Sequence, residues 1–192
     1  MFEIFEKYLT ERIELSGGQL SLIRSLTAEN KIARGALILR EGEICRNIHF
    51  VIKGLLRLYR IDAKGNEHIL RFAKENNWIS DRGSYLSGAP SAANIEAIEE
   101  SIILSWKKAD FDLLLKELPA FRELMRSLSA RIHIANLERL YSSISNSAEE
   151  KYILFIEKDR DICNRVPLYM VASYLGVTRE TLSRIRRVSI NK

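Results

Sequence analysis

Basic side chains crowd a short segment near the end of the sequence, and a single acid stands among them. GVTRETLSRIRR, residues 176–187, contains four arginines and Glu180. An arginine can bond to O6 and N7 of guanine with two N–H groups, while a glutamate can accept from the N4 amino group of cytosine. Attraction to phosphate alone would favour no acid, so Glu180 predicts contacts with base edges and a brace that orients a neighbouring arginine. The alternative is a solvated basic helix with an incidental acid.

The residues around this segment have the spacing of a helix-turn-helix, which weighs against that alternative. Counted from Leu168 as the first of twenty positions, Ala172 is the fifth and Gly176 is the ninth. A small residue lets two helices cross closely, and glycine permits the left-handed backbone of the turn. Thr178 can cap the second helix. The other matching positions are Pro167, which suits the start of the first helix, and the apolar inner-face anchors Leu182 and Ile185.

The outward residues of the second helix form the candidate reading face. We assign Arg184 and Glu180 to base edges, with Ser183 beside them. Arg179, at the start of the helix, can reach either a base or a phosphate. The remaining members of the predicted DNA-binding set are Thr178 and the phosphate contacts Arg186 and Arg187, with Lys192 as a further phosphate contact.

Positive charge is concentrated at this end of the chain. The net charge is +5; residues 1–118 hold 17 basic and 17 acidic side chains, whereas residues 119–146 carry +2 and residues 147–192 carry +3. A basic end predicts a polyanionic partner. No apolar run approaches the roughly 18 residues that span a bilayer. No nucleophile–base pair or phosphate loop indicates an enzyme.

Residues 31–106 have the texture of a β-rich domain. Short apolar runs alternate with turns, of which Lys53-Gly54 and DAKGNE (62–67) are predicted as hairpin connections. Strands this short, with turns at regular intervals, predict an antiparallel roll or jelly roll. The predicted strands are ALIL (36–39), NIHFVI (47–52), LLRLYRI (55–61), EHILRFA (67–73), ANIEAIE (93–99) and SIILSW (101–106).

From Ala109 the apolar period changes to about 3.6 residues, which predicts helix. Two apolar stripes run along this part, so one face can pack on the chain's own domain and the other on a partner. Burial of a single helix in one core is the alternative. The stripe predicted to pair with a symmetry mate is Leu118, Phe121, Met125, Leu128, Ile132 and Ala135. The second stripe is Leu124, Leu137, Leu140, Tyr141 and Ile144.

The chain then passes through a small polar stretch, SSISNS (142–147), which is predicted as a hinge. Ser147 is predicted to start a helix over AEEKYILFIEK (148–158), because acidic residues suit the first turn. DRDICNRV (159–166) is predicted to be a loop before the helix-turn-helix.

With these motifs the chain resembles the Crp/Fnr family of bacterial transcription regulators over about residues 20–190. The strongest match is ASYLGVTRETLSRIRR (172–187), whose E-x-x-S-R form is similar to the Fnr-type subgroup and implies half-sites with a TTGA-like core. GALILREGEICRNIHFVIKGLLRLY (35–59) is similar to the glycine-spaced hairpins of the family. The resemblance implies a cyclic-nucleotide-binding-like β-roll, a long dimer helix and a C-terminal helix-turn-helix.

Residues 78–99, WISDRGSYLSGAPSAANIEAIE, depart from the family's cyclic-nucleotide cassette. In the family a G-E pair and, about ten residues later, an R-S/T pair bind the cyclic phosphate. Here Ser80-Asp81 and Ser91-Ala92 stand at those places, so the arginine is absent and a negative charge is added. Cyclic AMP and cyclic GMP are therefore expected to bind weakly or not at all. With Tyr85 these residues outline a candidate pocket that takes another small molecule or is collapsed.

No metal or cofactor is expected. Cys45 and Cys163 are isolated, which favours a reduced, cytoplasmic chain and cannot furnish the four ligands of an Fnr-type cluster. The three histidines are dispersed along the chain and are interpreted as packing or surface residues: His49, His68 and His133.

The sequence thus predicts an α+β protein with three parts. These are a cyclic-nucleotide-binding-like sensor (1–118), a dimerisation helix with a hinge (119–146) and a helix-turn-helix domain (147–192) with little or no wing. The predicted partners are double-stranded DNA and a second copy of the chain, with RNA polymerase as a further candidate and the effector open. The alternative is a small-molecule-binding module that acts through protein partners and uses its helix-turn-helix as a docking surface.

Overall fold

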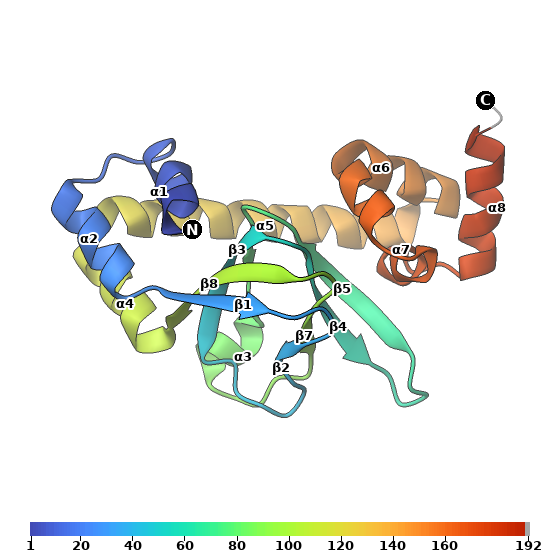
Figure 1. The fold of residues 1–192 in the computed structure, drawn as a ribbon. Coiled ribbons are helices and arrows are strands. Elements are labelled where there is room, and N and C mark those ends of the chain that lie inside the picture. The colour runs from blue at the N-terminus through green and yellow to red at the C-terminus, as the bar shows by residue number, and fades with distance from the viewer. Residues whose placement is uncertain (191–192) are drawn as a thin grey trace. The chain divides into compact units, whose positions relative to one another are not determined.

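The computed structural model describes residues 1–190. Within these residues, eight strands form a roll, and eight helices precede, interrupt and follow these strands along the chain (Figure 1). The strands are β1 (Ala28–Ile32), β2 (Leu37–Leu39), β3 (Asn47–Lys53), β4 (Leu56–Ile61), β5 (Glu67–Ala73), β6 (Trp78–Ile79), β7 (Asn94–Ala97) and β8 (Ser101–Lys107). The helices are α1 (Phe2–Thr10), α2 (Gly17–Ser25), α3 (Arg82–Ser87), α4 (Lys108–Glu117), α5 (Pro119–Ser145), α6 (Ala148–Arg165), α7 (Leu168–Leu175) and α8 (Arg179–Ile190).

The strands pair in two four-stranded sheets, with the orders β1-β8-β3-β6 and β2-β7-β4-β5. The pairings of β8 with β1 and β3, and of β7 with β2 and β4, are antiparallel. The predicted α+β class with an antiparallel β-roll is confirmed.

One predicted hairpin is wrong and the other is confirmed. Lys53-Gly54 connects β3 to β4, which lie in different sheets, so the chain crosses the roll there. Gly54 has a φ of 100°, and a Cβ on it would lie 2.2 Å from Ser101 Oγ, so only glycine fits this crossing. The DAKGNE turn does join neighbouring strands, β4 and β5, and its Asp62 carboxylate accepts from the backbone N–H of Asn66 at 2.9 Å.

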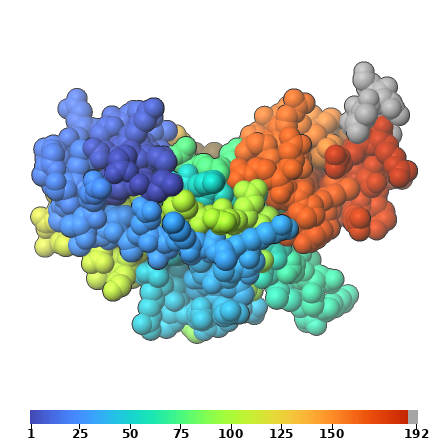
Figure 2. Space-filling view, in the orientation of Figure 1, coloured from blue at the N-terminus to red at the C-terminus, as the bar shows by residue number. Residues whose placement is uncertain are grey.

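The roll has apolar side chains on both faces of its first sheet. Between the two sheets lies one cluster, to which Val51, Ile95 and Ile103 belong. The other face of the first sheet packs on helices through aromatic rings such as Phe50, Trp78 and Trp106. The N-terminal helices, blue in Figure 2, take part in this second cluster through Phe5 and its neighbours.

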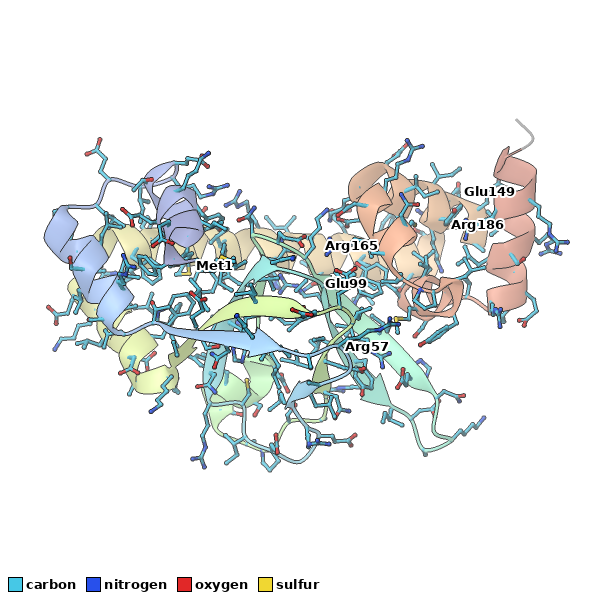
Figure 3. The ribbon with its side chains drawn as sticks, viewed as in Figure 1. Met1, Arg57, Glu99, Glu149, Arg165 and Arg186 are labelled. Carbon is cyan, nitrogen blue, oxygen red and sulfur yellow. The ribbon has the colours of Figure 1, made fainter. Side chains whose placement is uncertain are left out.

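Two ionisable side chains are among the polar groups buried in the sheets. Arg57 of β4, labelled in Figure 3, pairs with Glu96 of β7 at 2.6 Å and stacks 4.0 Å from the centre of the Tyr59 ring. His49 of β3 lies with Nδ1 2.7 Å from Ser105 Oγ, and burial lowers the pKa of His49 to about 4. The imidazole is therefore neutral at physiological pH, in keeping with the packing role that its isolation predicts.

The helical part differs from its prediction at residues 159–166. Helix α6 continues to Arg165, with a kink where Asp159 has a φ of −138° and a ψ of 44°. The predicted loop is therefore wrong. Although this stretch is mostly charged, its Ile162 side chain is buried, and this packing stabilises the second half of the helix. Ser147 caps the start of α6 as predicted, in a capping box with Glu150.

The chain divides into two compact units. One contains Met1–Arg60 and Arg71–Ser129, and the other contains Ile61–Leu70 and the chain from Ala130 onward. The division falls inside α5 and β5 and before the last residue of β4, whereas the predicted parts meet at residues 118 and 146.

Candidate nucleic-acid interface

Helices α7 and α8 are joined by the tight turn that the sequence spacing predicts. Gly176 ends α7 in the left-handed conformation, with a φ of 67°. Across the turn, the N–H of Val177 donates to the carbonyl oxygen of Ala172 at 3.0 Å. Thr178 then caps α8, since its Oγ1 accepts from the N–H of Thr181 at 3.1 Å. Pro167 lies at the N-cap of α7, one position before the predicted one.

The inner face of α8 is held by buried apolar side chains. Leu182 and Ile185 are buried, and so is Ala172 of α7. Helix α6 contacts both α7 and α8 and contributes buried side chains that include Phe155 and Ile162. The second helix is thus fixed by a small core, which leaves its other face exposed.

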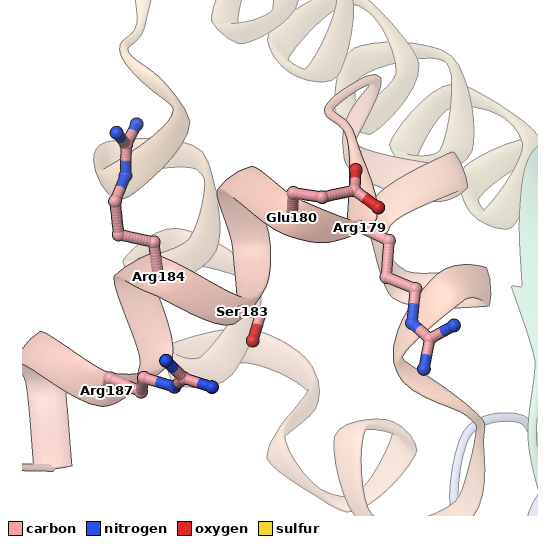
Figure 4. A pocket seen from close by; sticks show the side chains of 5 residues that line it. All are labelled: Arg179, Glu180, Ser183, Arg184 and Arg187. Carbon is pink, nitrogen blue, oxygen red and sulfur yellow. The ribbon is translucent and has the colours of Figure 1, made fainter.

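The exposed face of α8 carries a shallow groove of about 590 Å³, lined by Arg179, Glu180, Ser183, Arg184 and Arg187. All five belong to the predicted DNA-binding set. In Figure 4 the hydroxyl of Ser183 lies between Arg187 and Arg179, while Arg184 extends away from it. The four charged side chains are exposed, and atoms of α8 (red) are uncovered in Figure 2. Such a face combines cationic donors with one acceptor, which is what contact with phosphates and base edges needs.

Glu180 does not act as the predicted brace. Among the residues that the structure describes, no ion pair joins it to an arginine, although Arg184 lies one helical turn away. Its carboxylate therefore keeps its acceptor capacity for a group outside the chain.

Arg186 is placed differently from Arg187. Burial raises the pKa of Tyr152 and of Cys163, both in α6, and the nearby charge of Arg186 acts in the opposite direction on each. Arg186, labelled in Figure 3, is also absent from the residues that line the groove. The sequence pattern could not separate these neighbours, because both are arginines near the end of one helix. Lys192 lies outside the described residues.

The predicted effector residues are only partly brought together. The Asp81 carboxylate accepts from the Ser91 hydroxyl at 2.6 Å and from the N–H groups of Gly83 and Ser84 at the start of α3. Ser91 is buried, Ser80 is half-buried, and Ala92 is exposed.

Tyr85 is buried on α3, and burial together with the nearby Asp112 charge raises the pKa of its phenol. Sequence reasoning missed two contacts of this helix. Ser84 Oγ accepts from the N–H of Cys45 at 2.9 Å, and Arg82 donates to the Ser129 hydroxyl of α5. The position of a serine in the sequence does not indicate which distant residue its hydroxyl contacts, so neither contact could be predicted.

The apolar stripes of α5 have a different assignment from the predicted one. Leu118 and Phe121 are buried in the chain's own aromatic cluster, and Met125 and Leu128 pack against it. Ile132 and Ala135 are half-buried. The side chains that face solvent belong mainly to the second stripe: Ile134, Leu137, Leu140, Tyr141 and Ile144. The N-terminal end of the predicted seam is therefore corrected. Leu118 and Phe121 are buried inside the chain and have almost no exposed surface with which to contact a partner.

Neither a metal-binding cluster nor a membrane-spanning helix is found among the described residues. No group of three or more His, Cys, Asp or Glu within residues 1–190 is arranged to hold a metal ion. Within the same residues, every helix is too short or too polar to cross a membrane.

The chain is similar to a protein-family model and to known regulatory proteins. A family model described as a cyclic nucleotide-binding domain matches residues 29–117. The nitrogen fixation regulation protein FixK of Bradyrhizobium diazoefficiens is 28% identical over 190 residues, which covers 88% of this chain and 75% of FixK. Electron transport regulator A of Shewanella oneidensis is 24% identical over 186 residues, covering 89% of this chain and 72% of the relative.

Two solved structures share the fold. FixK2 from Bradyrhizobium japonicum is 19% identical and superposes with a TM-score of 0.68, covering 84% of this chain and 83% of that one. The catabolite activator protein of Thermus thermophilus is 22% identical with a TM-score of 0.55, covering 92% and 84%.

Proposed function

Because the chain belongs to the Crp/Fnr family of transcription regulators, we propose that it binds inverted-repeat DNA sites as a homodimer, through the outer face of α8. The observation that carries this proposal is the exposed groove of three arginines, Ser183 and Glu180, on a helix whose inner face is anchored. A two-fold dimer reads half-sites whose centres are about 34 Å apart, or a multiple of that repeat. RNA polymerase is a further candidate partner.

The second copy is proposed to bind along the exposed stripe of α5. Ile134, Leu137, Tyr141 and Ile144 are spaced three, four and three residues apart, the repeat of a coiled-coil seam. They are exposed in a single chain, with Tyr141 at 67% and Ile144 at 79%. Side chains of this kind gain most from burial against a symmetry mate. The C-terminal part of the predicted seam, Ile132 and Ala135, lies beside this stripe and borders the interface.

The experiment that tests the proposal is selection of duplexes from a random pool by the purified protein. An inverted repeat should emerge, and its affinity should fall steeply with salt because bound counterions are released. If the protein bound heparin but selected no sequence, its basic face would bind polyanions by charge alone, without base recognition. Absence of both would favour the alternative of a regulatory module that docks on proteins.

Replacing Arg187 by alanine is expected to weaken binding to selected and scrambled duplexes about equally. Arg187 lines the groove and is assigned to a phosphate, so its loss should lower the salt slope by roughly one unit per half-site. Arg186→Ala is the matched control, since it removes the same charge from the side of α8 near Tyr152 and Cys163. Its salt slope should change less. Equal slopes for the two variants, measured by titrations at several salt concentrations, would contradict the assignment.

The effector pocket is proposed to reject cyclic nucleotides. The carboxylate of Asp81 accepts hydrogen bonds from the hydroxyl of Ser91 and from two backbone N–H groups. These donors are therefore already paired with a negatively charged group and are not available to a phosphate. A second anion placed beside that charge would be repelled. Isothermal titration with cyclic AMP and with cyclic GMP should therefore give no binding at micromolar concentrations. A micromolar Kd for either nucleotide would refute this part of the proposal.

A further inference from the structure

The start of strand β5, in the β4–β5 hairpin, is hydrogen-bonded to the first helix of the helix-turn-helix. The Ser173 hydroxyl of α7 accepts from the N–H of Ile69 at 3.0 Å and donates to the carbonyl oxygen of Glu67 at 2.7 Å. One side chain therefore satisfies two backbone groups of β5 that are more than 100 positions away in sequence. Both partners are main-chain atoms, so the contact fixes the backbone of the strand itself.

Tyr174, the next residue of α7, adds contacts with two other helices. The guanidinium of Arg139, on α5, lies 4.9 Å from the centre of the Tyr174 ring. The ring of Phe155, on α6, lies 5.3 Å from it. Two consecutive residues thus join α7 to the hairpin, to α5 and to α6. Gly176 and the start of α8 follow immediately, so the direction in which α7 is held sets the direction of the reading helix.

Strand β5 connects this junction to the rest of the chain. Its residues as far as Leu70 belong to the compact unit that contains α7 and α8, and those from Arg71 onward belong to the other unit. The strand is short, and Ala73 at its far end is completely buried in the cluster between the sheets. A change in the packing of that cluster would therefore shift β5, and the same strand carries the backbone groups that Ser173 binds.

We propose that Ser173 is a positioning residue for DNA binding, which clasps the β4–β5 hairpin and couples the β-roll to the reading helix. This inference rests on the proposed function. The clasped arrangement is the binding-competent one, because the groove residues of α8 are uncovered while both Ser173 hydrogen bonds are made. Coupling between two sites is reciprocal, so bound DNA should in turn stabilise the clasp.

The test compares Ser173→Ala with Ser173→Thr, which keeps the hydroxyl, and with Ser25→Ala. Ser25 is an exposed serine whose hydroxyl donates to Leu22 of its own helix α2, so it controls for loss of a serine hydroxyl. Each variant is titrated with the selected duplex and with a scrambled one. Ser173→Ala should bind the selected duplex about fivefold more weakly per subunit, the worth of one net hydrogen bond. The threonine variant should recover most of that loss, and the scrambled duplex should bind all variants alike.

A second readout separates coupling from simple stability. Hydrogen exchange of the Ile69 amide is followed with and without the selected duplex. In the wild type, DNA should slow this exchange although Ile69 is not on the reading face; in Ser173→Ala, the exchange should be fast and should not respond to DNA.

The outcomes that overturn the inference are distinct. Selective binding by the wild type, with Ser173→Ala equal to Ser25→Ala, would overturn the clasp alone. So would an Ile69 amide that responds to DNA equally in the wild type and in Ser173→Ala, or in neither. Failure of the wild type to select any duplex would overturn the proposed function and the clasp together.

Discussion

Leu137→Glu is expected to convert the dimer into a monomer and to lower affinity for the selected inverted repeat by on the order of 100-fold, because a monomer loses the second linked half-site. Leu137 is 51% exposed in a single chain and lies in the middle of the proposed seam. In a two-fold dimer the substitution would place two carboxylates at the same interface, where burial of an unpaired charge is costly.

The choice of Leu137 follows from the burial of its helix. Substituting a charge at Leu128, in the predicted seam, would strike a side chain that packs on the aromatic cluster, so the monomer itself would be destabilised. Leu113→Glu is the matched control, since it makes the same change at an exposed leucine of α4. Sedimentation should show a monomer for Leu137→Glu and a dimer for Leu113→Glu, and circular dichroism should show that both variants remain folded. A dimeric Leu137→Glu protein would place the interface elsewhere.

The sequence could predict that α5 has two apolar faces, but not which one faces inward. Apolar periodicity reports that a stripe is buried against something, and a chain's own core and a second chain are equally apolar. Phe121 shows the difficulty. Its ring belongs to a cluster that includes side chains of α1, α2, β3, β6, β8 and α4, as far as 119 positions before it, and no local pattern indicates that contact. The sequence predicts that the stripe beginning at Leu118 faces the partner, whereas most of this stripe packs inside the chain.

Motifs that are set by backbone geometry could be predicted well. The helix-turn-helix spacing fixes Gly176, Thr178 and Leu182 by steric requirements within a few residues, and the structure places them as expected. Residues 159–166 show the limit of the same reasoning. Their charges indicate a loop, but buried Ile162 and the contacts of α6 with α7 and α8 outweigh that local preference.

The same limit applies to the long-range polar contacts. The pairing of Ser173 with the hairpin backbone and of Arg82 with Ser129 joins residues distant in sequence, and a single serine carries no sequence signal for such a contact. By contrast, the substitution of the phosphate-binding pair by Ser91-Ala92 was visible, because the family resemblance supplied the expected residues.

Replacement of Arg184 by alanine is expected to change both affinity and sequence preference. Arg184 is exposed on the reading face and makes no ion pair within the described residues, so its guanidinium remains able to bind guanine with two hydrogen bonds. Loss of that contact should cost roughly 1–3 kcal/mol per half-site and relax the preference at one base pair in each half-site.

Arg184→Lys is the sharper companion of this variant. Lysine keeps the positive charge but lacks the planar fork of donors, so it should preserve the salt slope while losing much of the base preference. Arg187→Ala provides the opposite pattern, with a lowered slope and an unchanged preference. If Arg184→Ala and Arg187→Ala weakened selected and scrambled duplexes to the same extent, α8 would be an electrostatic anchor without base recognition.

Glu180→Ala is expected to reduce specificity more than affinity, and it completes the test of the reading face. The carboxylate has no arginine partner among the described residues, so its acceptor oxygens are free to take a cytosine N4 amino group. Removing the acid also removes repulsion from nearby phosphates, which offsets part of the lost contact. Binding of single-base variants of the selected site should therefore show a flattened preference at one base pair, with similar affinity for the best sequence. An unchanged preference at every position would mean that Glu180 does not face a base.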